Sequence, residues 1–366
     1  MRIAQVAPLF ESVPPRLYGG TERVVSWLTE KLVQLGHDVS LFASGDSVTN
    51  AKLIPVCKRA LRLDSSCIDP LAHHTVMMDE VFSRITDFDL IHFHVDYLHF
   101  PLSKRATVPC VSTLHGRLDL PDLVPLFKRF RDQPVVSISD EQRKPLPWLN
   151  WQGTVPHGLP ARSLALHHSE GNYLAFLGRV APEKGLDQAI RISQRTGIPL
   201  KVAAKIDQTD RKYFDSTIKP LLASPLVDFV GEIGNSEKSA FLGNAKALLF
   251  PIQWPEPFGL VMIEAMACGT PVIAYPFGSV PEIIRDGVCG YLVASIDEAV
   301  GAVERLGELD RRAIRRYFEL NFTDDRMAYN YLSIYQKLLH PKSTSIKVEE
   351  GVVNWIELEP SAPSTT

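Results

Sequence analysis

Long apolar runs are absent from the 366-residue sequence, in which no stretch reaches the ~18 consecutive apolar residues that a membrane-spanning helix needs. The opening run Ile3–Ala7 is too short for the apolar core of a signal peptide and is better interpreted as a first buried strand. The formal net charge is only −3, so the composition does not favour nucleic acid as a partner. We therefore expect a globular protein of the cytoplasm.

Cysteine is scarce as well. The 5 cysteines are odd in number and include no CxxC pair, so they form neither a zinc pattern nor a disulfide framework. Reduced thiols fit a cytoplasmic protein. A G-x-G-x-x-G motif following a strand is also missing, which argues against a dinucleotide-dependent dehydrogenase.

The chain does contain an almost unbroken alternation of short β-branched runs with amphipathic segments. A helical pattern over Thr21–Leu35 separates the first two runs and is stopped by Gly36. This rhythm predicts parallel sheets with helices on both faces. The expected strands are Ile3–Ala7, Val39–Ala43, Leu90–His94, Cys110–Leu114 and Val135–Ile138 in the first half, and Tyr173–Leu177, Leu200–Ala204, Val227–Val230, Ala247–Phe250, Val272–Ala274 and Tyr291–Val293 in the second.

The length and the 45% hydrophobic content suit two domains, each with its own core. A turn-rich stretch that starts near Val155 and runs to Gly171 predicts a linker between them. Two doubly wound, Rossmann-like α/β domains that face each other would bind ligands in the cleft at the carboxyl ends of their strands. The expected boundaries are 1–160 for the first domain, 171–322 for the second, 323–340 for a C-terminal helix and 341–366 for a partly mobile tail.

Two carboxylates stand in the segment from Trp254 to Val272, which reads as turn, helix and buried strand. Glu256 lies in the Pro/Gly turn, and Glu264 lies in a helix predicted from about Phe258 to Ala267 whose other side chains are apolar. A carboxylate in such a helix faces a cleft or needs a buried partner. It can accept hydrogen bonds from two vicinal hydroxyls at once. The alternative is a helix-capping Glu256 and a solvated Glu264.

The seven residues between Glu256 and Glu264 resemble the EX7E signature of the retaining glycosyltransferases of family four. The resemblance is close over 170–295 and looser over 1–160. It implies the two-domain GT-B fold and transfer of a hexose from a UDP- or GDP-linked donor. The other segments that resemble sequence motifs of the family are Leu177–Gly185, Phe229-Val230-Gly231, Gly278–Glu282 and Asp286–Gly290.

By this resemblance, Glu264 binds the ribose hydroxyls of the nucleotide and Glu256 holds the donor sugar. Backbone amides at the start of the following helix would help to place the sugar, in agreement with the unsatisfied amides and positive dipole end of a helix N-terminus. A turn further upstream would contact the base. The remaining donor-site residues implied are Phe258, Gly259 and Leu260 at the helix and Gly231 and Ile233 in the upstream turn.

Arg179 and Lys184 flank the turn after the first strand of the second domain. Two cations at this position can neutralise a departing diphosphate, and the resemblance implies that role. The alternative is a solvated arginine and a lysine paired with Glu183. Lys205 departs from a Gly-rich ending that many family members have, and it would add a phosphate contact or alter nucleotide preference.

In the first domain, Gly19 and Gly20 precede a helix, and paired glycines let the backbone approach a phosphate or sugar. Thr21 alternatively caps that helix. The resemblance implies a loop that contacts the diphosphate and the acceptor, and it implies that His115, at a strand's carboxyl end, reaches the transferred sugar. His92 and His94 share one sheet face, but we do not expect a metal there.

We expect no metal and no cofactor, because the nucleotide sugar is itself a substrate. Metal-dependent transferases hold Mn²⁺ or Mg²⁺ with closely spaced acidic residues. Adjacent acidic residues outside the inferred donor site occur at Asp79-Glu80, Asp140-Glu141, Asp324-Asp325 and Glu349-Glu350.

The acceptor is left open between a sugar, a lipid-linked compound and a small molecule, and the oligomeric state is open too. Phe127–Arg131 interleaves cations with aromatics, so it would either rest on the inner face of a membrane or form a solvated helix face. Two other functions compete, namely a nucleotide-sugar 2-epimerase and a silent sugar-binding domain. The EX7E motif and the presence of Arg179, Lys184, Glu256 and Glu264 favour the transferase.

Overall fold

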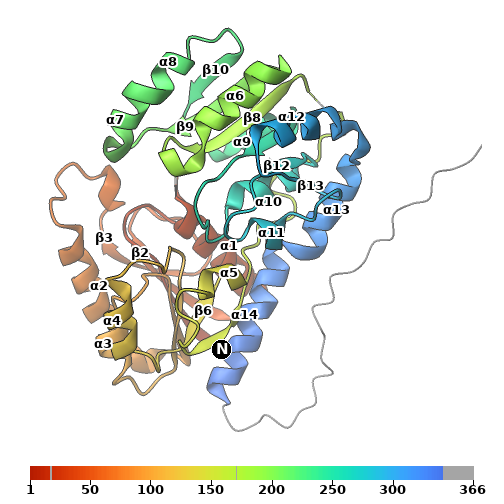
Figure 1. The fold of residues 1–366 in the computed structure, drawn as a ribbon. Helices are drawn as coiled ribbons and strands as arrows, with labels where there is room; N and C mark the ends of the chain where they lie inside the picture. Colours follow the sequence, from red (N-terminus) through yellow and green to blue (C-terminus); the bar gives the residue numbers. More distant parts are fainter. Residues whose placement is uncertain (17–18, 170, 341–366) are drawn as a thin grey trace, which may run out of the picture.

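The computed structural model describes residues 1–16, 19–169 and 171–340, so the tail predicted at 341–366 lies outside the described part. Two separate parallel sheets organise the chain (Figure 1). The first has seven strands in the order β3-β2-β1-β4-β5-β6-β7, and the second has six in the order β10-β9-β8-β11-β12-β13. In both sheets the strand order reverses beside the first strand, which is the doubly wound arrangement predicted from the sequence.

The first sheet is built on β1, whose Ile3 pairs with Val39 of β2 on one side and with Leu90 of β4 on the other. Its strands are β1 (Arg2–Val6), β2 (Asp38–Ser44), β3 (Lys52–Cys57), β4 (Leu90–Phe93), β5 (Cys110–Thr113), β6 (Val135–Ser137) and β7 (Trp151–Thr154). The helices that connect them are α1 (Gly20–Gln34), α2 (Pro70–Ser83), α3 (Phe100–Ser103), α4 (Leu123–Arg129) and α5 (Asp140–Arg143).

The second sheet repeats this plan around β8, which pairs with β9 and β11. Its strands are β8 (Tyr173–Arg179), β9 (Leu200–Lys205), β10 (Val227–Gly231), β11 (Ala245–Phe250), β12 (Val272–Ala274) and β13 (Gly290–Leu292). The accompanying helices are α6 (Leu186–Thr196), α7 (Arg211–Tyr213), α8 (Lys219–Leu221), α9 (Asn235–Gly243), α10 (Leu260–Ala267), α11 (Val280–Ile283), α12 (Ile296–Glu304) and α13 (Arg311–Asn321).

Strands β3 and β7 are missing from the sequence prediction. Both lie at an edge of the first sheet. Pro55 interrupts the β-branched pattern of β3, and Gly153 that of β7. Proline lacks a donor N–H and is tolerated in a sheet only at such an edge.

The last helix, α14 (Asp324–Leu339), follows the second sheet in sequence but packs on the first (Figure 1). Its fully buried Tyr331 and Tyr335 share a core with Ile3 and Leu28. The apolar face predicted for this segment therefore packs against the first half of the molecule.

The stretch predicted to be a linker is packed rather than free. Leu159 and Leu164 belong to the core of the second sheet. The guanidinium of Arg315 on α13 donates hydrogen bonds to the carbonyls of Ala161 and Leu164. The connection between the two sheets is thus held against α13.

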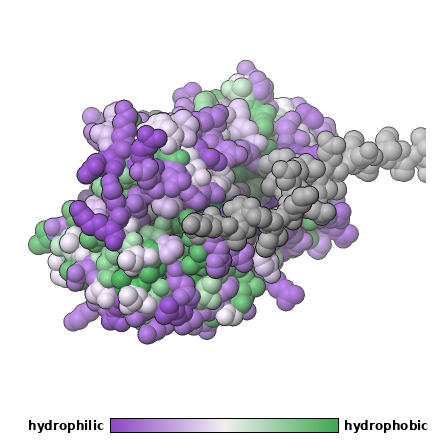
Figure 2. Space-filling model, turned by 90° about the horizontal axis from the view of Figure 1, so that it is seen from below, coloured by the Kyte–Doolittle hydropathy of each residue, from purple (hydrophilic) through white to green (hydrophobic). Residues whose placement is uncertain are grey.

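The basic segment on α4 has its aromatic side turned inward. Phe127 is 1% exposed and lies 5.9 Å from the ring of Phe100, whereas Lys128 and Arg129 are exposed. The cations of this segment are thus on the surface, which both a solvated helix face and a membrane contact require. Hydrophilic and hydrophobic side chains are interspersed over the face seen in Figure 2, and no helix among the described residues is long and apolar enough to cross a membrane.

Candidate functional site

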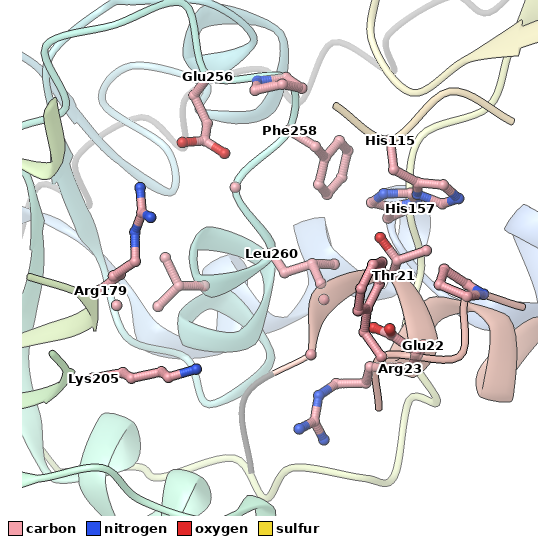
Figure 3. A pocket seen from close by; sticks show the side chains of 18 of the residues that line it. Thr21, Glu22, Arg23, His115, His157, Arg179, Lys205, Glu256, Phe258 and Leu260 are labelled. Atoms are coloured by element: carbon pink, nitrogen blue, oxygen red, sulfur yellow. The ribbon is translucent and has the colours of Figure 1, made fainter. Parts of the chain in front are cut away.

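A cleft of about 730 Å³ lies where the carboxyl ends of strands from both sheets meet (Figure 3). Its walls come from the loop before α1, the ends of β4 and β5, the ends of β8 and β9, and the turn into α10. The site residues predicted from the sequence that line it are Gly19, Gly20, His115, Arg179, Lys184, Ile233, Glu256, Phe258, Gly259, Leu260 and Glu264. Gly231 is the exception. It ends β10 with a φ of 79° and does not line the cleft.

Glu256 is held in the turn before α10 by two donors. Nζ of Lys184 lies 2.5 Å from its Oε2, and the indole Nε1 of Trp254 donates to the same oxygen at 2.9 Å. Glu256 does not cap α10, because Gly259 occupies the N-cap position with a φ of 82°. A Cβ on Gly259 would also lie 2.8 Å from Cε of Met262, so glycine is required there. The helix begins two residues later than predicted for this reason.

Glu264 is 3% exposed, which contradicts the alternative of a solvated carboxylate. Its Oε1 accepts a hydrogen bond of 2.6 Å from Nζ of Lys238 on α9. Arg23 of α1 approaches from the other half, is 4% exposed, and donates to Oδ1 of Asn235 at 3.0 Å. Burial lowers the pKa of Arg23, and the negative charge of Glu264 opposes that shift. Lys238 and Arg23 carry no sequence signal of their own, because only the fold brings them to Glu264.

Arg179 is embedded in acidic partners on the wall of the second half. Its guanidinium lies 2.7 Å from Glu183, 3.4 Å from Asp210 and 3.8 Å from Asp207. The alternative interpretation predicted that Lys184 pairs with Glu183. This pairing is wrong, because Glu183 binds Arg179 instead. Nζ of Lys205 lies 3.1 Å from Asp207, which places a further cation in the cleft wall beside Arg179 (Figure 3).

The loop before α1 brings backbone close to the cleft. A Cβ on Gly19 would lie 2.7 Å from Cβ of Pro15, so only glycine fits there. Gly19 is the N-cap, and among the described residues no side chain caps α1, so Thr21 does not have the simple capping role. Glu22 follows on the first turn, is 6% exposed, and has its pKa raised mainly by burial.

His115 sits on the first-half wall with its imidazole stacked on a second histidine. Its ring centroid lies 5.2 Å from that of His157, which in turn contacts the ring of Phe258 at 4.8 Å. Nε2 of His115 lies 2.9 Å from Nδ1 of His94. Burial lowers the pKa of His115 to about 3, so the ring is neutral at physiological pH. His92 and His94 are engaged in protein hydrogen bonds through both ring nitrogens.

Asp96, two residues after His94, also lines the cleft. It has a φ of 52°, which is unusual for a residue other than glycine. Its side chain is exposed to the cleft, and desolvation by the surrounding protein raises the pKa of its carboxyl to about 6. Such a shifted carboxyl beside a histidine marks a candidate functional group.

The sequence also holds one DxD triplet, Asp87-Phe88-Asp89, and a further adjacent acidic pair, Asp297-Glu298. Asp89 binds the guanidinium of Arg2 at 2.8 Å, at the amino end of the first sheet. Neither acidic grouping lines the cleft. The triplet is therefore not placed to hold a diphosphate-bound metal in this site.

Comparison with solved structures defines the class of the fold. Sucrose-phosphate synthase from Thermosynechococcus elongatus superimposes with a TM-score of 0.76 at 18% identity, over 93% of this chain and 99% of that one. Anabaena HepE in complex with UDP and glucose superimposes with a TM-score of 0.71 at 16% identity, over 92% and 99%. With its two facing doubly wound sheets, the chain has the GT-B fold of glycosyltransferases.

Sequence comparison identifies the family. The profile described as Glycosyltransferase Family 4 matches residues 18–175, and the profile described as Glycosyl transferases group 1 matches residues 163–318. Phosphatidyl-myo-inositol mannosyltransferase of Mycolicibacterium smegmatis is 24% identical over 97% of this chain and 98% of that protein. The chain belongs to glycosyltransferase family 4.

Proposed function

We propose that the chain transfers a hexose from a UDP- or GDP-linked donor to a hydroxyl acceptor, with retention of anomeric configuration and without a divalent metal. One observation carries the proposal. Two carboxylates from one turn-helix unit, Glu256 and Glu264, are each bound by a lysine and face the same cleft as Arg179. A nucleotide sugar offers hydroxyls to the carboxylates and a diphosphate to the cations.

The nucleoside would lie at Glu264. One oxygen of this carboxylate is engaged by Lys238, and ribose hydroxyls would bind the carboxylate as charge-assisted donors. Ile233 lines the same wall and offers an apolar contact to the base. The structure of HepE with UDP and glucose supports a nucleotide-sugar donor for this fold.

The diphosphate would lie between Arg179, Lys184 and the first turn of α10. The free amides of that turn and the helix dipole favour an anion. Negative charge develops on the leaving diphosphate in the transition state, so preorganised cations there accelerate transfer. The hexose would then reach Glu256 on one side and His115 on the other.

The test is incubation of the purified chain with UDP-glucose and, separately, with GDP-mannose, with and without candidate acceptors. Released nucleotide that depends on an acceptor supports transfer. Nucleotide released without any acceptor, together with an epimerised sugar, would indicate a hydrolysing 2-epimerase, and binding without turnover would indicate a silent sugar-binding protein. Candidate acceptors are a free sugar, a lipid-linked compound and a small molecule, which the sequence leaves open. Inositol is included as the small molecule because the Mycolicibacterium smegmatis relative is a phosphatidyl-myo-inositol mannosyltransferase.

A further inference from the structure

A buried chain of hydrogen bonds connects the cleft histidine to the C-terminal helix. It is called the buried relay here and consists of His115, His94, Gln5, Tyr335, His92, Thr113 and Tyr331. The relay members other than His115 are at most 2% exposed. Buried polar groups destabilise the folded state unless each one has a hydrogen-bond partner. The donor and acceptor roles in one link of such a network therefore constrain those in the next.

The first links fix how the protons are arranged at the cleft end. Nε2 of His94 lies 2.8 Å from Oε1 of Gln5, and an amide oxygen can only accept, so His94 carries its proton on Nε2. Burial holds the pKa of His94 far below its ordinary value, so its ring is neutral and Nδ1 bears a lone pair. That lone pair lies 2.9 Å from Nε2 of His115, which must therefore be the protonated nitrogen of His115.

The remaining links continue from the Gln5 amide to α14. Nε2 of Gln5 donates to the hydroxyl of Tyr335 at 3.2 Å, and that hydroxyl lies 2.7 Å from Nδ1 of His92. His92 continues to Thr113 at 2.7 Å, and Thr113 continues to the hydroxyl of Tyr331 at 2.9 Å. Every member can donate to the next in one direction, from the cleft to α14. In the structure Tyr335 accepts from the amide nitrogen of Gln5, which is turned away from His94. The reverse direction would require the Gln5 amide to turn and the hydroxyl of Tyr335 to donate to its oxygen.

The consequence appears at the other ring nitrogen of His115. Nδ1 is buried and has no partner among the residues that the structure describes. The relay leaves it as a lone-pair acceptor in a ring that lines the cleft. Because Nδ1 is buried, a substrate hydroxyl reaches it when binding shifts the His115 ring toward the cleft. A hydroxyl is then a donor that can complete it, whereas a phosphate oxygen cannot.

We propose that Tyr335 is a positioning residue that acts through Gln5 and His94 to hold His115 in its Nε2–H form, so that Nδ1 accepts a hydrogen bond from a substrate hydroxyl. The expected effect on turnover rests on the proposed function, but the protonation pattern of His115 does not. The C-terminal helix would thereby act on the cleft without touching the substrate.

Two tyrosines of α14 provide a matched pair for the test. Tyr335→Phe removes the acceptor of the Gln5 amide and frees it to turn. Tyr331→Phe makes the same chemical change one helical turn away, but only at the far end of the relay. Both tyrosines are 0% exposed, so packing effects of the two changes are comparable.

The primary measurement is two-bond nitrogen–proton NMR of the full chain labelled with ¹⁵N-histidine, with His115→Gln used to assign the signal. We expect a protonated Nε2 and a lone pair on Nδ1 of His115 in the wild type and in Tyr331→Phe. We expect exchange with the other tautomer in Tyr335→Phe, together with a fall in kcat of up to about tenfold, the scale of one neutral hydrogen bond. Tyr331→Phe should stay within about twofold of the wild type in kcat.

A wild-type His115 protonated on Nδ1 would overturn the proposal, and so would identical His115 spectra in both tyrosine variants. If Tyr335→Phe does not fold, Gln5→Leu breaks the same stretch of the relay and is compared with Tyr331→Phe in its place. Absence of turnover in the wild type with every donor would count against the proposed function, while the spectra would still decide the relay.

Discussion

Nζ of Lys184 lies 2.5 Å from Oε2 of Glu256, and this ion pair joins two turns whose residues are 72 positions apart. Lys184 follows β8 and Glu256 follows β11, which are neighbouring strands of the second sheet. The pair therefore forms at the carboxyl edge of that sheet, where its side chains line the cleft. It supplies a preset position for a carboxylate that would bind sugar hydroxyls and for a cation that would bind phosphate.

We predict that Glu264→Gln weakens donor binding by roughly 10- to 100-fold, because a charge-assisted hydrogen bond is worth about 1.5–3 kcal/mol. The substitution preserves shape but removes the charge that faces Lys238. Calorimetric titration with the donor and with the free nucleoside diphosphate measures the effect. Glu304→Gln, an exposed change on α12, is the control. Donor affinity equal to that of the control in a folded variant would refute the role.

Arg179→Ala should lower kcat by about 10²–10³-fold, the scale observed when one preorganised donor is removed from a developing anion. The change also leaves Glu183 and Asp210 without their partner, so thermal melting must accompany the kinetics. Arg195→Ala is a matched control, because Arg195 pairs with Asp297 outside the cleft. A loss of stability without a loss of kcat would assign Arg179 a structural role.

Transfer from an α-linked donor is predicted to give an α-linked product. This expectation rests on the resemblance to the retaining transferases. Proton NMR of the newly formed linkage, recorded early in the reaction, reports the anomeric configuration directly. A β-linked product would show an inverting reaction.

Turnover is predicted to persist in excess EDTA. Arg179, Lys184 and the first turn of α10 would supply the positive field on the leaving diphosphate. The assay compares initial rates with EDTA, without EDTA and after addition of Mg²⁺ or Mn²⁺. A rate that EDTA abolishes and either ion restores would show that a metal carries this charge.

Stability is predicted to fall as pH drops below about 6.5. Burial lowers the pKa of His92, His94, His99, His115 and His157 in the folded chain. The unfolded chain therefore binds more protons once its histidines titrate, and each such histidine costs about 1.4 kcal/mol per pH unit below 6.5. Asp96 acts with the opposite sign, because its pKa of about 6 lies above the unfolded value and the folded chain takes up that proton first.

Urea unfolding at pH 7.5, 6.5 and 5.5 measures this dependence in a window above the titration of ordinary carboxyls. The midpoint should be highest at pH 7.5 and decrease at each step. A midpoint that is constant or rises on acidification would show that these histidines do not remain neutral and buried in the folded chain.

Periodicity predicts most of the fold because interior strands read as continuous apolar runs between turn signals, as at Val272–Ala274, where the predicted bounds agree with the structure. Edge strands are half exposed, so β3 with Pro55 and β7 with Gly153 lose that signal. The site residues are predicted where they belong to one continuous sequence motif, as around Glu256. Arg23, Lys238 and Asp96 cannot be found in this way, since their role depends on contacts between elements far apart in sequence.

The return of α14 to the first sheet means that neither half of the chain is a complete folding unit. A fragment that ends before residue 170 would lack Tyr331 and Tyr335, and its core would stay open where α14 belongs. The complementary fragment would carry the apolar face of α14 with nothing to cover it. Two such fragments, expressed together, should reassemble through α14 in the manner of a split protein, and donor hydrolysis or transfer would then report their association.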